Sequence, residues 1–104
     1  MVYYSKIAQN DLIEIFWGLL TWEKHPLEYD HVTSYLDELQ EVCNRLDQLN
    51  YHSKAKFQTH RQFGDFAYMY RRNRNTKWYI IYDYDEITKF VYIKHIMPNH
   101  TSLK

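Results

Sequence analysis

The chain has 104 residues, of which 45% are apolar and 25% charged, with only two glycines and two prolines. This composition predicts one globular domain and excludes a disordered or linker-rich chain. The single cysteine, Cys43, excludes an internal disulfide and fits a reducing compartment. No apolar run approaches the ~18 residues of a membrane span, and the first residues do not resemble a signal peptide. We therefore expect a cytoplasmic protein without membrane contact.

The net charge is zero, but the charge is divided unevenly between the two halves of the chain. Residues 1–52 contain three Lys/Arg and nine Asp/Glu, a balance of −6. Residues 53–104 contain ten Lys/Arg and four Asp/Glu, a balance of +6. This division favours an anionic partner for the second half, although ordinary solvated faces would give the same count.

The first half predicts a short strand followed by two helices. Residues 2–4 are rich in strand formers, and Ser5 is a candidate helix cap. Two apolar stripes with helical spacing follow, separated by a break at Pro26, and Asp30 is a candidate cap for the second helix. Helices joined by a short link pack antiparallel, so residues 7–51 predict a helix hairpin. The second stripe is the stronger and comprises Val32, Tyr35, Leu36, Leu39, Val42, Cys43, Leu46 and Leu49.

The second half predicts a basic segment over residues 52–63 and a β-meander over about residues 64–97. Its three runs of alternating residues begin near Phe66, Trp78 and Phe90, and turn-like residues separate them. Pro98 is expected to end the last strand. The predicted fold is therefore a single α+β domain, in which an N-terminal strand and an antiparallel helix hairpin pack on a three- to four-stranded antiparallel meander.

Basic and aromatic residues alternate through the basic segment and the first hairpin. Cations bind phosphates and aromatic rings stack on unpaired bases, so this pattern is typical of contact with RNA or DNA. An exposed charged hairpin, or the docking surface of an acidic protein, would show the same pattern. The candidate contact residues are Lys54, Lys56, Arg61, Arg71, Arg74, Lys77 and Lys94.

The remaining chemistry rests on histidines. None of the six has the spacing of a metal site, so we expect neither a metal nor another cofactor. His60 and His100 lie in polar surroundings and are candidates for general acid or base, with solvated surface histidines as the alternative. His95 alternates with apolar positions, which predicts a half-buried, satisfied side chain. Cys43 lies in the apolar stripe and is expected in the core rather than as a nucleophile.

Three short patterns and their order resemble the RelE/ParE toxin superfamily of bacterial toxin–antitoxin modules. Residues 4–15, with Ser5, Ala8 and Asp11-Leu12, are similar to the opening of that family. Residues 78–82, which end in a tyrosine, are similar to its central strand. Residues 91–96 are similar to its last strand, and the Pro98–His100 tail falls where the family often has His or Arg. The resemblance spans nearly the whole chain.

The resemblance implies a plasmid-stabilisation toxin that acts on translation or on DNA gyrase and is neutralised by a protein antitoxin. RelE-like members cut messenger RNA on the ribosome, whereas ParE-like members inhibit gyrase and are not nucleases. A nuclease would be a ribosome-dependent endoribonuclease that uses His100 or His60 for proton transfer. Arg72, together with Arg71 and Lys94, would then stabilise charge.

A second interpretation is a non-catalytic protein-interaction module that reuses the fold without toxicity. The zero net charge favours it, as does Tyr79, which occupies the place where the family's central strand often carries an arginine. The sequence leaves the target, the antitoxin and the oligomeric state open.

Overall fold

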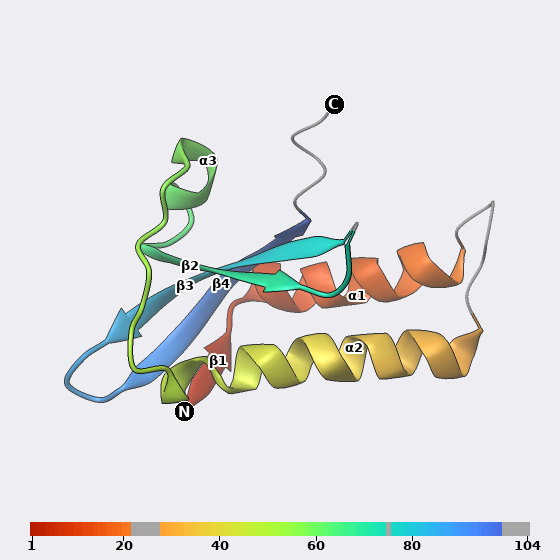
Figure 1. The fold of residues 1–104 in the computed structure, drawn as a ribbon, viewed down its shortest axis with the longest axis horizontal. Coiled ribbons are helices and arrows are strands. Elements are labelled where there is room, and N and C mark those ends of the chain that lie inside the picture. The colour runs from red at the N-terminus through yellow and green to blue at the C-terminus, as the bar shows by residue number, and fades with distance from the viewer. Residues whose placement is uncertain (22–27, 75, 99–104) are drawn as a thin grey trace.

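The computed structural model describes residues 1–21, 28–74 and 76–98, which form one mixed sheet with helices on both faces (Figure 1). Pro26, the predicted break between the helices, and the predicted tail with His100 lie outside these residues. The elements in chain order are β1 (Val2–Tyr4), α1 (Lys6–Leu20), α2 (Tyr29–Asn44), the 3-10 helix η1 (Leu46–Gln48), α3 (Gln58–Arg61), β2 (Phe66–Arg71), β3 (Lys77–Asp85) and β4 (Phe90–Pro98).

The sheet has the strand order β1-β4-β3-β2. β2 with β3 and β3 with β4 pair antiparallel, whereas β1 pairs parallel with β4, with Val2 opposite Val91. The three C-terminal strands pair antiparallel, as predicted for the meander, but the sheet as a whole is mixed because β1 joins it in parallel. Three residues of strand-forming sequence contain no signal for the direction or identity of their neighbour, so only the folded chain settles this pairing.

The α1–α2 hairpin packs along one face of the sheet, with its helices side by side and antiparallel (Figure 1). Ser5 caps α1 as predicted, since its hydroxyl accepts a hydrogen bond from the Ala8 amide at 3.0 Å. α2 begins earlier than predicted: Glu28 occupies the N-cap position and Asp30 lies in the first turn. Cys43 is fully buried in the core, as expected, and burial raises the pKa of its thiol to about 12.

One irregularity in β4 decides which of its residues reach this core. Ile81 pairs with His95 while Tyr82 pairs with Ile93, so Lys94 has no partner across the ladder. An extra residue in one strand shifts the side-chain alternation by one. Ile93 and Ile96, three residues apart, are consequently both buried, which a simple alternation over the whole strand does not predict.

The opposite face of the sheet is partly covered by α3 and the loop after it (Figure 1). Phe63 contacts His95 with ring centroids 4.5 Å apart, and Ile81 is fully buried. The segment predicted only as basic therefore contains a short helix, which is too brief to produce a periodic signal. Beyond α3 this face is exposed, with Met69 at 44% and Tyr92 at 39% exposure. Over the described residues, no helix is both long and apolar enough to cross a membrane.

Candidate functional site

A pocket of about 370 Å³ lies between α3 and the outer edge of β2, and we call it the α3 pocket. It contains two of the predicted contact lysines and one of the predicted catalytic histidines. Its lining residues are Ser53, Lys54, Lys56, Phe57, His60, Ala67, Tyr68, Met69 and Tyr79.

The chain before α3 builds one wall of this pocket by pairing with the start of β2. The Ala67 amide donates to the Ser53 carbonyl at 3.0 Å, and the Ala55 amide donates to the Asp65 carbonyl at 2.9 Å. Ala55 is buried, whereas Lys54 and Lys56 on either side of it are exposed. Two backbone bonds therefore fix the point from which both lysines extend.

The pocket combines cations with aromatic surface. The Phe57 ring is 55% exposed and meets the Tyr79 ring at 6.1 Å in an edge-on contact. Exposed rings beside lysines provide a stacking surface and a countercharge for a phosphate or carboxylate. This arrangement suits an anionic ligand, and Lys54 and Lys56 are the predicted contact residues that line the pocket.

His60 is the floor of the α3 pocket rather than an accessible acid–base group. Its side chain is buried, with Tyr79 at 4.7 Å and Phe57 at 5.2 Å between ring centroids. Burial, followed by the nearby His95, lowers the pKa of His60 below its ordinary value. Nδ1 of His60 is buried and has no hydrogen-bond partner among the described residues. Burial disfavours the charged form of the ring, and little of the side chain is exposed to the pocket that it lines.

Arg72, the second predicted catalytic residue, lies on the other face of the sheet. Its guanidinium forms an ion pair with Glu38 of α2 and lies 3.9 Å from the centre of the Tyr35 ring. Tyr35 in turn accepts a buried hydrogen bond from Trp78 Nε1 at 2.8 Å. Arg72 therefore ties the end of β2 to α2, and His60 and Arg72 do not form one site.

The other predicted contact residues do not form a single surface. Arg61 lies at the end of α3, where its guanidinium donates to the Lys56 carbonyl at 2.5 Å. Arg71 and Lys77 are opposite each other across the β2–β3 ladder, and Arg74 is exposed in the turn that joins these strands. Lys94 lies at the irregularity of β4. The third predicted catalytic residue, His100, is outside the described residues.

His95 is half-buried and satisfied, as predicted. Its Nδ1 lies 2.5 Å from the Asp11 carboxylate, which also accepts the Ile96 amide at 2.8 Å. Asp11 thus accepts a hydrogen bond from an edge amide of β4 at a position where the three-residue β1 no longer pairs with that strand. The pair borders a pocket of about 480 Å³ that also contains Glu14, and this acidic lining disfavours an anionic ligand.

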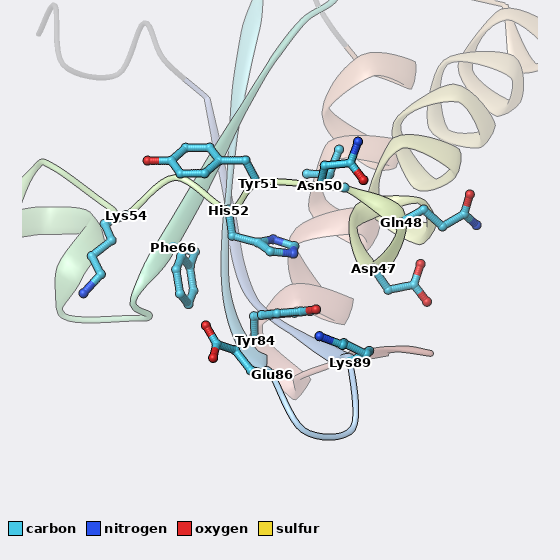
Figure 2. Close-up of a pocket in the computed structure, with 11 residues that line it drawn as sticks. Asp47, Gln48, Asn50, Tyr51, His52, Lys54, Phe66, Tyr84, Glu86 and Lys89 are labelled. Atoms are coloured by element: carbon cyan, nitrogen blue, oxygen red, sulfur yellow. The ribbon is translucent and has the colours of Figure 1, made fainter.

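A larger pocket, of about 790 Å³, lies beside η1 and was not predicted (Figure 2). We call it the His52 pocket. The His52 ring stacks on Tyr84 at 3.8 Å, and its Nδ1 lies 2.7 Å from the Tyr82 hydroxyl. Burial lowers the pKa of His52 and raises that of Tyr82 to about 12. Figure 2 shows charged side chains of both signs around these rings, namely Asp47, Lys54, Glu86 and Lys89.

Two polar atoms in the His52 pocket, His52 Nε2 and Asp47 Oδ1, are buried without a hydrogen-bond partner among the described residues. No pattern in the sequence indicated this pocket, because its residues come from η1, the following loop, β2, β3 and the β3–β4 turn. Only the loop after η1 brings His52 onto Tyr84. The pocket has mixed charge and therefore carries a weaker chemical signal than the α3 pocket.

Comparison with known proteins adds no family. No family model matches the chain, and no curated protein is detectably similar to it. Among the described residues, no group of three or more His, Cys, Asp or Glu side chains is placed to hold a metal ion.

Proposed function

We propose that this protein is the toxin component of a type II toxin–antitoxin module, acting in the cytoplasm on translation or on DNA gyrase. The α3 pocket is the surface that holds the target, and a protein antitoxin is the partner that neutralises it. The observation that carries the proposal is the position of Lys54 and Lys56 beside the exposed Phe57 ring. These lysines occupy the places where the resembled family has basic residues before its meander.

Within this proposal, the geometry favours a toxin that blocks its target by binding over one that cleaves RNA. General acid–base catalysis needs a titratable group within hydrogen-bond reach of the substrate. His60 is buried, and Arg72 is held on the opposite face by Glu38 and Tyr35. The pair therefore lacks the geometry of one cleavage site, whereas the exposed cations of the α3 pocket need only make contact.

Induced expression in a bacterial host tests the proposal. We expect growth arrest with the natural sequence and growth with a Lys54→Gln, Lys56→Gln variant. The matched control is Lys6→Gln, Arg45→Gln, which removes the same charge from exposed positions on the helix side. Growth arrest that persists in the pocket variant, at equal expression, would rule out the α3 pocket as the target surface.

Purified protein then separates the two targets. Messenger cleavage during in vitro translation indicates the endoribonuclease, whereas loss of DNA supercoiling with purified gyrase indicates the gyrase inhibitor. Blocked translation with intact messenger indicates a toxin that binds without cleaving.

The second candidate is a non-toxic protein-interaction module. It is favoured by the engagement of Arg72 within the fold, since an arginine already paired with Glu38 is not available to a phosphate. Harmless expression of the natural sequence, together with a binding partner recovered from the native host, would support this candidate over the toxin.

A further inference from the structure

The outer edge of β2 is only half covered. β2 is the last strand of the sheet, with β3 on its inner side. At its start, the Ala67 amide points outward and donates to Ser53, and Lys54 bridges to Phe66. On the N-terminal side of Ser53 the chain does not follow this edge. There, His52 contacts Tyr82 and Tyr84 in the His52 pocket.

Two further residues of β2 present backbone groups at this open edge. Successive residues of an edge strand point their amides alternately inward and outward. Because the Ala67 amide points outward, those of Met69 and Arg71 do so too. Among the described residues, no backbone carbonyl accepts a hydrogen bond from the Met69 amide or the Arg71 amide at this edge. An edge with unpaired amides and carbonyls is a template for another strand.

The side chains along this edge specify the charge of such a strand. Arg71 and Lys77 lie directly opposite each other, and like charges in that position repel. Lys56 in the α3 pocket adds a third cation on the same face of the sheet. In the part of the chain that the structure describes, none of these three cations forms an ion pair with a carboxylate.

The two faces of an added strand would meet different surroundings. On the α3 face, its side chains would lie beside Arg71 and the mouth of the α3 pocket, which also contains Met69. On the helix face, they would lie beside Tyr68 and Tyr70, which pack against the core. Acidic side chains suit the first face and apolar side chains suit the second.

We propose that the open edge of β2 binds an extended, acidic segment of a partner protein as a fifth strand of the sheet. The segment alternates acidic residues, which face Arg71, Lys77 and Lys56, with apolar residues, which face the tyrosines. Main-chain bonds to Met69 and Arg71 provide affinity and the cations select the sequence. This inference concerns the partner rather than the target, and it stands whether or not the protein is toxic.

The test uses the purified full chain and a blocked eight-residue peptide of alternating glutamate and valine. We expect binding by calorimetry, and protection of the Met69 and Arg71 amides from hydrogen exchange. Met69→Pro removes one outward amide without touching the β2–β3 ladder, because proline is tolerated where the amide faces outward from an edge strand. It should weaken binding about tenfold, the effect of one lost hydrogen bond, while the matched Met69→Ala should retain it.

Charge is tested separately. The double variant Arg71→Gln, Lys77→Gln should lower the affinity for the glutamate peptide about threefold, the effect expected of solvent-exposed ion pairs. It should also reduce the salt dependence of binding. Lys6→Gln, Arg45→Gln should leave binding unchanged.

A peptide N-methylated on its pairing side should fail to bind the natural protein, which tests backbone pairing even if Met69→Pro does not fold. Equal binding of a lysine–valine peptide, or unprotected Met69 and Arg71 amides, would overturn the proposal. A dimer that Met69→Pro abolishes, without any peptide binding, would instead assign the edge to a second copy of the chain. None of these outcomes depends on growth arrest, so failure here is distinct from failure of the proposed function.

Discussion

Gly64 lies where the loop after α3 meets the centre of β3, and replacing it tests how closely that loop packs. A Cβ atom added at Gly64 would lie 3.0 Å from the Tyr82 carbonyl oxygen, 3.1 Å from Ile81 Cγ2 and 3.2 Å from the Tyr82 carbonyl carbon. Two of these atoms belong to the backbone of the central strand and cannot rotate away. Gly64→Ala therefore forces the loop and α3 to move off the sheet.

The size of the effect follows from these distances. Carbon atoms in good contact lie about 3.5–4.0 Å apart, so the loop must retreat by roughly half an ångström. Overpacking of this kind costs about 1–3 kcal/mol in the free energy of unfolding. In a domain of this size, each kcal/mol lowers the melting temperature by about 4–8 °C. The same shift would loosen the floor of the α3 pocket.

Thermal unfolding followed by circular dichroism measures this effect, and Gly18→Ala is the matched control. Gly18 lies within α1 with nothing inside 4 Å of an added Cβ, so alanine there should stabilise the protein by up to about 1 kcal/mol. The same chemical change is thus expected to act in opposite directions at the two glycines. A Gly64→Ala protein as stable as the natural one would refute the close packing of this loop on β3.

Two further predictions concern Arg72 and the histidines His52 and His60. Arg72→Gln should lower the free energy of unfolding by about 1 kcal/mol, because it loses a partly exposed ion pair with Glu38 and the contact with the Tyr35 ring. The same variant should leave growth arrest unchanged. Urea unfolding and induced expression check this, and a variant of unchanged stability that no longer arrests growth would return Arg72 to the target site. Burial lowers the pKa of His52 and of His60 below the ordinary value of 6.5, so the unfolded chain binds these protons at higher pH than the folded one. Their contribution to stability is therefore full above that value and is lost as the pH falls below it. Urea unfolding at about pH 7.5 and about pH 5.5 should show a smaller acid loss in His52→Gln, His60→Gln than in the natural protein; an equal loss would contradict the assignment.

Local patterns predicted the longer elements of this fold, but neither the short helices η1 and α3 nor every pairing between strands. The cap at Ser5, the buried stripe through Leu39 and Cys43, and the three C-terminal strands each depend on neighbours within a few residues, and the structure has them. The parallel pairing of β1 with β4 joins residues about ninety positions apart. Nothing in the three residues of β1 indicates that partner.

The candidate site divides in the same way. Lys54 and Lys56 were identified from charge and aromatic spacing alone, and they do line the α3 pocket. The predicted role of His60 as an acid or base does not fit the structure, because polar neighbours along the chain do not show that the side chain faces inward against Tyr79. The sequence around Arg72 does not indicate its partners either, because Glu38 and Tyr35 belong to α2, which is distant along the chain.

By itself, the sequence determined the longer elements, namely the two helices of the hairpin and the three C-terminal strands, but not the short helix α3. Periodicity, capping and turn residues act over a few positions, and they are written directly in the chain from Ser5 to Pro98. Tertiary structure decided what each charged or titratable group is available to do. The folded chain left one edge of β2 open. It placed α3 over Tyr79 and the loop after α3 over His95, and it paired Arg72 with Glu38. Availability depends on burial and on contacts between distant segments, and these exist only once the chain has folded.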